Sequence, residues 1–159
     1  MRTRKGFFPS CKPANGGRIR RNPAFLGCHL RYPEGAGLDE QIRFVTHNGC
    51  RVLLIDLSNC SPSEVMQICK LVPGHISSEP PGSVLLLADF TGAQFDRKAI
   101  TSLKEATVMV RPHLRRSAWV GVETLPHVFY ENIKSFSQRD LPTFLSRDQA
   151  MAWLVRDCP

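Results

Sequence analysis

The chain has 159 residues and a formal net charge of +7, and its length suffices for one domain with a hydrophobic core. No stretch of about 18 apolar residues occurs, which argues against a membrane-spanning helix. Residues 1–37 contain eight Lys or Arg and one Glu, whereas residues 38–159 contain 13 residues of each sign, so the first segment carries the whole net charge. A neutral domain lacks the basic surface that nucleic-acid binding needs, so such binding is expected only non-specifically, through residues 1–37.

Residues 1–37 are predicted to be a disordered basic leader, and residues 38–159 the folded domain. Gly and Pro are scattered through the leader, and its apolar residues show no periodicity. Three interpretations stay open: an unstructured extension without specific function (even an over-extended start of translation), an organelle transit peptide, or a nucleic-acid-binding arm. No apolar stretch resembles a secretory signal, so a cytoplasmic location is expected.

The cysteines predict neither a zinc site nor a redox motif. None falls in a C-x-x-C pair, and no Cys/His spacing suits a metal. In a reducing compartment we expect all six to be free thiols: Cys11, Cys28, Cys50, Cys60, Cys69 and Cys158.

The domain is predicted to open with an antiparallel hairpin. Apolar runs at 42–46 and 51–57 flank Asn48-Gly49, a pair that tolerates positive φ and favours a two-residue turn.

Helices and strands are then predicted to alternate. A capping-box pattern of Ser61 and Glu64 starts a helix that Pro73-Gly74 should end or kink. Asp96 precedes the second helix, and a second capping-box pattern precedes the last one. The remaining expected elements are strands at 83–90, 117–122 and 142–145, and helices at 96–110, 125–136 and 147–154.

This order predicts an α/β fold: a mixed, mostly parallel sheet of about five strands opened by the antiparallel hairpin, with about four helices packed on it. In such sheets, functional residues gather where the strands end.

Known catalytic motifs are absent from the sequence. It contains no G-x-G-x-x-G, no Walker loop and no G-x-S-x-G elbow. Asp56, Asp89 and Asp96 follow or end strands and could serve acid–base or metal chemistry, although backbone satisfaction and helix capping explain them better. Cys60 precedes a helix N-terminus, which can lower a thiol pKa.

The segment 85–96, LLLADFTGAQFD, together with IRFVTHNGCRVLLIDLS, WVGV and TFLSRDQAMAWL, resembles the STAS domains of anti-sigma-factor antagonists. Residues 40–157 also resemble the small bacterial SpoIIAA-like proteins, which carry a combined STAS and CRAL-TRIO lipid-transfer label. The leader has no counterpart in these families.

The resemblance implies a partner-binding surface at 89–98. In antagonist STAS domains, a comparable strand end leads to Asp-Ser-Ser-Gly, and one of those serines is phosphorylated to break partner binding. Here Asp96 matches the acid, but Arg97, Lys98 and Ala99 replace the Ser-Ser-Gly. The phospho-acceptor serine is therefore missing, and two cations stand at a helix N-terminus that attracts anions. The candidate ligand- or partner-binding residues are Asp89, Thr91, Gly92, Asp96, Arg97 and Lys98.

Three functions are consistent with these patterns. The first, which we expect, is a non-enzymatic cytoplasmic regulatory module that binds a protein partner or a small anionic ligand without a cofactor or metal. The second is a CRAL-TRIO-like carrier of a lipid or apolar ligand, which would need a large cavity, or a peripheral membrane protein. The membrane protein would need exposed aromatic residues in the helix at 124–136, namely Phe129, Tyr130 and Phe136. The third is a weak enzyme or redox protein that uses Cys60.

Overall fold

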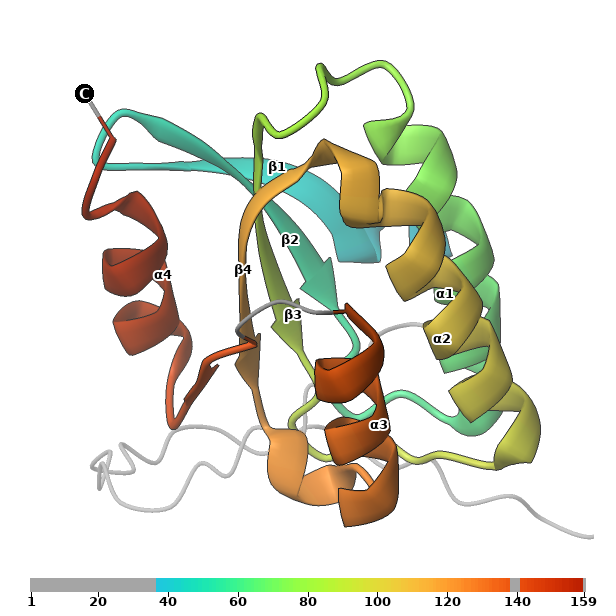
Figure 1. Ribbon diagram of the computed structural model, residues 1–159. Coiled ribbons are helices and arrows are strands. Elements are labelled where there is room, and N and C mark those ends of the chain that lie inside the picture. Colours follow the sequence, from blue (N-terminus) through green and yellow to red (C-terminus); the bar gives the residue numbers. More distant parts are fainter. Residues whose placement is uncertain (1–36, 138–140, 159) are drawn as a thin grey trace, which may run out of the picture. The chain divides into compact units, whose positions relative to one another are not determined.

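The computed structural model describes residues 37–137 and 141–158, and residues 1–36 with their predicted leader functions lie outside these ranges. The predicted fold class is confirmed: five strands form one mixed sheet, and four α-helices pack against it (Figure 1). The strands are β1 (Ile42–His47), β2 (Cys50–Asp56), β3 (Val84–Asp89), β4 (Leu114–Val120) and β5 (Thr143–Phe144). The helices are α1 (Pro62–Ile76), α2 (Arg97–Val110), α3 (His127–Ser137) and α4 (Arg147–Val155).

The strand order explains why three helices share one face of the sheet. The strands lie in chain order, β1-β2-β3-β4-β5, with β1 antiparallel to β2 and every later pair parallel. Because each crossover steps in the same direction and crossovers are right-handed, α1, α2 and α3 must pack on the same side. The opposite side is covered by α4, which follows the last strand (Figure 1).

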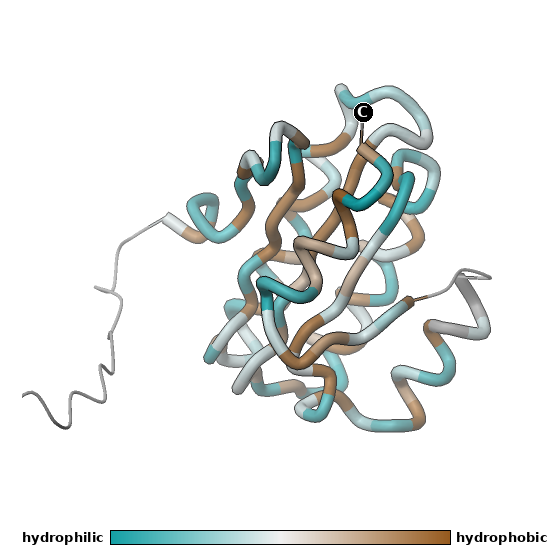
Figure 2. The backbone as a smooth tube through the Cα atoms, turned by 90° about the vertical axis from the view of Figure 1, so that its left-hand side faces the viewer, coloured by the Kyte–Doolittle hydropathy of each residue, from teal (hydrophilic) through white to brown (hydrophobic). Residues whose placement is uncertain are grey.

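Two hydrophobic clusters flank the sheet. The larger one lies beneath α1, α2 and α3 and includes Leu53, Leu86 and Phe90. The smaller one lies beneath α4 and includes Val52, Leu87 and Leu154. Hydrophobic residues run along the strands, and hydrophilic residues are more frequent in the loops (Figure 2). Alternate side chains of β2 and β3 thus serve both clusters, as expected for strands buried on both faces.

Local signals predicted the turns and helix starts well. Asn48 and Gly49 adopt φ values of 49° and 78° and close the β1–β2 hairpin. Ser61 and Glu64 form the reciprocal capping box at the start of α1, and Asp96 caps α2 by accepting the N–H of Ala99 at 2.7 Å.

The structure corrects two expectations about helices. Pro73 and Gly74 do not end α1, which continues to Ile76. A proline removes one N–H bond, but the next turn still forms, since Ser77 N–H donates to the carbonyl of Pro73 at 3.0 Å, and Ile76 is buried. Helical spacing within 125–136 predicts that Val128 faces the core together with Phe129 and Ile133, but Val128 lies on the outside of α3 with an exposed fraction of 72%.

The expectation that every cysteine is a free thiol is wrong for two of them. Cys50 and Cys158 form a disulfide, with Cα atoms 6.3 Å apart. Cys50 begins β2, and Cys158 follows the helix that packs on the same face of the sheet, so the tertiary fold brings together residues 108 positions apart. Cys60 and Cys69 are buried free thiols, and Cys11 and Cys28 lie outside the described residues.

Candidate functional site at the carboxyl end of the sheet

Two acidic residues end adjacent parallel strands. Asp56 is the last residue of β2, and Asp89 is the last residue of β3. The strand register places them side by side, and both are buried. Two carboxylates in such a position would repel each other unless a cation lies between them.

That cation is Arg147, the first residue of α4. Its Nη2 donates to Asp56 Oδ1 at 2.7 Å, and its Nε donates to Asp89 Oδ2. Ser58 completes the cluster, because its hydroxyl donates to Asp56 Oδ1 at 2.5 Å, and the backbone N–H of Thr91 donates to Asp89 Oδ1 at 2.9 Å. We call Asp56, Asp89 and Arg147 the ionic clasp. It ties the start of α4 to two strands.

The ionic clasp favours ionised side chains. Burial alone would raise the pKa of Asp56, but hydrogen bonds from Ser58 and Arg147 and the positive charge of Arg147 outweigh burial and hold it below its ordinary value. Burial likewise opposes the charge on Arg147, yet the two carboxylates raise its pKa further. A carboxylate held ionised in this way is poorly suited to general acid catalysis near neutral pH.

The loop between β3 and α2, residues 90–96, is joined to the loops on both sides of it. On one side, Asn59 N–H donates to the carbonyl of Thr91 at 2.8 Å, and Gln94 N–H donates to the carbonyl of Cys60 at 2.9 Å. On the other side, the Thr124 hydroxyl donates to the carbonyl of Phe90 at 2.9 Å. We call residues 90–96 the central loop.

Two glycines permit the close approach of these loops. Gly121 has φ +70°, and a Cβ at this position would lie 2.3 Å from the backbone nitrogen of Thr91. Gly92 also has φ +70°, and its Cβ would lie 2.4 Å from Asn59 Oδ1. At Gly121 the close atoms are backbone, so positive φ and absent space together require glycine. At Gly92 the close atom is the end of the Asn59 side chain, so positive φ is the main reason for glycine.

The candidate binding residues divide into two groups. Asp89 is buried in the ionic clasp and therefore supports the site from below. The others lie at the surface: Thr91, Gly92, Asp96, Arg97 and Lys98 are exposed. Asp96, however, uses a carboxylate oxygen to cap α2. Asp56 and Asp89 come together as the strand-end pattern indicated, whereas Asp96 is not part of the clasp.

Arg147 was missed at the sequence level. It lies within the SRDQ pattern that predicted a helix start. That pattern gives no sign that Arg147 contacts Asp56, 91 residues earlier, and Asp89, 58 residues earlier. The only available hint was the pair of adjacent strand-end aspartates, since two buried carboxylates need a cation nearby.

Cys60 is not an activated thiol. Its side chain is buried, with an exposed residue fraction of 3%. Burial, with a smaller effect from the charge of Glu64, raises the pKa of Cys60 to about 11. A helix N-terminus can lower a thiol pKa, which made a reactive Cys60 possible beside the commoner buried, inert cysteine; here desolvation of the thiolate is the larger effect. Burial and the raised pKa therefore argue against an activated thiol at this residue.

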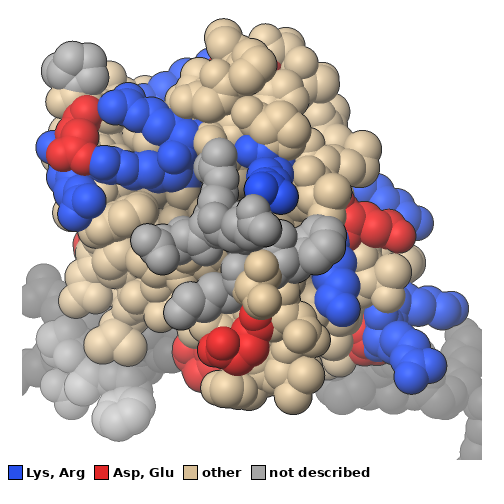
Figure 3. All heavy atoms as spheres, viewed as in Figure 1, with Lys and Arg blue, Asp and Glu red and all other residues tan. Residues whose placement is uncertain are grey.

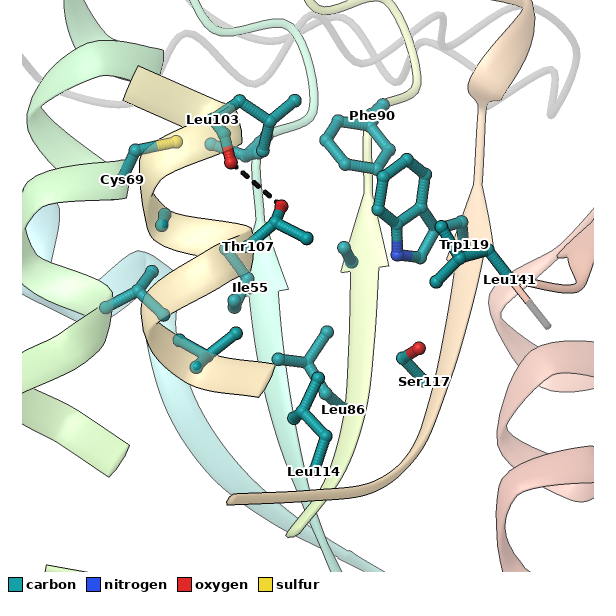
Figure 4. Close-up of a pocket in the computed structure, with 15 residues that line it drawn as sticks. Ile55, Cys69, Leu86, Phe90, Leu103, Thr107, Leu114, Ser117, Trp119 and Leu141 are labelled. Atoms are coloured by element: carbon teal, nitrogen blue, oxygen red, sulfur yellow. Dashed lines mark hydrogen bonds between the residues drawn. The ribbon is translucent and has the colours of Figure 1, made fainter. Parts of the chain in front are cut away.

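The interior offers little room for a lipid. A cavity of about 50 Å³ lies between α2 and the strands, lined among others by Leu103, Phe90 and Trp119 (Figure 4). Lipid-sized ligands need several hundred cubic ångströms, so this core cavity is too small for one. A larger hollow of about 750 Å³ lies between α2 and α3, and its lining, which includes Lys104, Glu105 and Ile133, is of mixed polarity. Phe129 is buried, and Tyr130 is half-buried with its hydroxyl donating to the carbonyl of Leu141, so neither of these rings presents a membrane-facing surface. The third aromatic residue of this expectation, Phe136, has a side chain outside the described part of the structure.

On the face of the molecule shown in Figure 3, basic and acidic side chains are mixed. Figure 3 shows basic and acidic side chains meeting near the end of α4, where Arg116 and Arg156 both pair with Asp157. Among residues 37–137 and 141–158, no group of three His, Cys, Asp or Glu side chains could hold a metal ion, and no helix is long and apolar enough to cross a membrane.

Comparisons with known proteins identify no relative of this chain. No family model, no curated protein and no solved structure matches this chain.

Proposed function

We propose that this chain is a non-enzymatic binding module, and that the central loop together with Arg97 and Lys98 is its contact surface. One observation carries the proposal: the backbone of the central loop is fixed by its neighbours, while its polar side chains face solvent. Thr91 and Gln94 are exposed, although backbone groups of the same two residues bond to the preceding loop.

A fixed, exposed loop suits recognition. Binding costs less conformational entropy when the contact residues already hold their bound geometry. Here the geometry is set from three sides: Asn59 bonds to Thr91, Gly121 packs against it, and Asp89 accepts its N–H. The ionised clasp beneath the loop has a structural task and does not require substrate chemistry.

The charge at this surface favours an acidic contact. Arg97 and Lys98 are exposed in the first turn of α2, and within the described ranges neither has an ion-pair partner. The carboxylate of Asp96 is turned to the helix backbone as its cap. A helix N-terminus with two adjacent cations attracts carboxylates and phosphates. We therefore propose a protein partner that presents an acidic group.

The proposed module would not be switched by phosphorylation as antagonist STAS domains are. Arg97, Lys98 and Ala99 replace the acceptor motif. The nearby Ser102 is buried in α2, and the Thr101 hydroxyl donates to the carbonyl of Arg97. The resemblance to STAS domains thus supports the location of the surface but not the covalent switch.

Site-specific photo-crosslinking in the native cells tests this proposal. A photoreactive phenylalanine analogue replaces Gln94 in the central loop or, as a matched control, the exposed Gln67 on α1. We expect a discrete crosslinked protein only from position 94, and we expect the double substitution Arg97→Ala/Lys98→Ala to remove it. Equal adducts from both positions, or an adduct that survives the double substitution, would contradict the proposed surface.

A second measurement separates a protein partner from a small anionic ligand. Inorganic phosphate is titrated into the isotope-labelled chain while the amide resonances of residues 91–98 are followed. Saturable shifts that disappear in Arg97→Ala/Lys98→Ala, without any crosslinked protein, would favour the small-ligand alternative.

A further inference from the structure

Among the residues that the structure describes, the outer edge of the sheet at β1 has backbone groups without a hydrogen-bond partner. The two-residue turn makes His47 and Cys50 a hydrogen-bonded pair of the antiparallel ladder, and such pairs alternate along the strands. Ile42, Phe44 and Thr46 therefore direct their N–H and C=O groups away from β2. The N–H of Ile42 donates to Asp39, but the groups of Phe44 and Thr46 have no hydrogen-bond partner among the described residues.

This edge lacks the features that normally prevent strand-to-strand association. Proteins protect edge strands with proline, bulges, charged side chains or short length. The β1 strand has six residues in continuous register, no proline and no bulge. Its one formally charged side chain, Arg43, donates a hydrogen bond to the carbonyl of Glu40 at 2.9 Å, so the guanidinium is engaged within the same chain.

The opposite edge of the sheet is protected. Its last strand, β5, has only two residues. The part of β4 that extends beyond β5 carries Arg115 and Arg116, and both bond to Asp157. The contrast within one sheet indicates that the β1 edge is kept open for a partner.

We propose that two copies of this chain associate through antiparallel pairing of their β1 strands, which joins the two sheets into one. A two-fold axis at Val45 places Phe44 of one copy opposite Thr46 of the other. Each of these residues has both backbone groups free, so the N–H and C=O groups of Phe44 and Thr46 pair completely across the axis.

The side chains fit this register. Val45 lies opposite Val45 of the second copy, a β-branched pair that favours strand association. Arg43 lies opposite His47 of the second copy, and no second guanidinium faces it. Phe44 carries the guanidinium of Arg51 3.5 Å from its ring centre, so its ring is covered on one side and half-buried before association.

Analytical ultracentrifugation of the full chain tests the dimer, with Thr46→Pro as the main variant. Proline removes the N–H that bonds to the second copy, but the ladder with β2 loses nothing, because this N–H points away from β2. Thr46→Val is the matched control, since it also lacks the hydroxyl but keeps the N–H. We expect a concentration-dependent dimer in the wild type and in Thr46→Val, and a dimer dissociation constant raised about tenfold or more in Thr46→Pro.

Hydrogen exchange gives a second readout that does not depend on the variants folding equally well. In the wild type, the Phe44 and Thr46 amides should gain protection as the chain concentration rises, because association pairs them. A monomer at every concentration, a dimer that Thr46→Pro leaves unchanged, or protection of these amides that is independent of concentration would overturn the proposal. The last outcome would assign the edge to another segment of the same chain.

Discussion

Replacing Arg147 by methionine should destabilise the domain strongly at neutral pH, because the substitution leaves two buried carboxylates without their cation. Asp56 loses a contact of 2.7 Å, and Asp89 loses its contact with Nε. Removing one partner of a buried ion pair costs about 3–5 kcal/mol. Arg147 is 37% exposed, so solvent screens part of its interaction, and each carboxylate keeps a neutral donor. We therefore expect a loss of about 3 kcal/mol.

The pH dependence of this loss separates the ionic clasp from simple packing. In the wild type, the pKa of Asp56 is lowered, so its contribution to stability is present above the unfolded-state pKa and disappears as the pH falls through the folded-state pKa. In Arg147→Met, burial and the neighbouring Asp89 should raise the pKa of Asp56 instead. Near pH 4, acid relieves the variant by protonating Asp56, whereas the wild type loses the contribution of Asp56 mainly below that pH. The difference between the two proteins should therefore shrink to about 1 kcal/mol near pH 4.

Urea denaturation of both proteins at pH 7 and near pH 4 measures these free energies of unfolding, provided that the slopes agree. The control is the triple variant Arg147→Met/Asp56→Asn/Asp89→Asn. It removes all three charges while keeping hydrogen-bond acceptors for Ser58 and Thr91, and it should recover most of the lost stability. A loss below about 1 kcal/mol at pH 7, or an equal loss at both pH values, would refute the assignment of an energetic role to the clasp.

Three further outcomes can be measured on the same domain. Gly121→Ala should lower the free energy of unfolding by about 2–4 kcal/mol, because the new Cβ would lie 2.3 Å from a backbone atom. The control is Gly49→Ala, which is also at positive φ but has open space around it, and it should lower the free energy of unfolding by about 1 kcal/mol in the same urea titration. Cys60 should resist iodoacetamide in the native chain and react only in denaturant, because burial raises its pKa to about 11. Rapid alkylation of Cys60 in the native chain, detected by peptide mass mapping, would contradict this prediction. Reduction with dithiothreitol should lower the free energy of unfolding by about 3 kcal/mol, since the disulfide of Cys50 and Cys158 closes nearly the whole domain into one loop. The control is Cys50→Ala, whose stability should be the same with and without the reductant.

The sequence by itself determined the local structure and, through it, the fold class. Asn48-Gly49 specified the hairpin because its two residues tolerate positive φ. Ser61 and Asp96 specified helix starts because their side chains accept backbone N–H groups a few residues away. The alternation of apolar strands with capped helices then required right-handed crossovers and a mostly parallel sheet. Each of these signals acts over a few residues, so each could be recognised without knowing the tertiary structure.

The tertiary structure decided what lies at the candidate site. Arg147 meets Asp56 across 91 positions, and Cys158 meets Cys50 across 108. Both contacts exist because α4, alone among the helices, crosses to the other face of the sheet, and nothing in the residues around 147 or 158 indicates that face. The pKa of Cys60 also depends on tertiary structure: its place before a helix left both an activated thiol and a buried, inert one open, and its burial beneath the surrounding elements raises the pKa. Long-range contacts and burial depend on the packing of whole elements, and local sequence patterns carry no information about them.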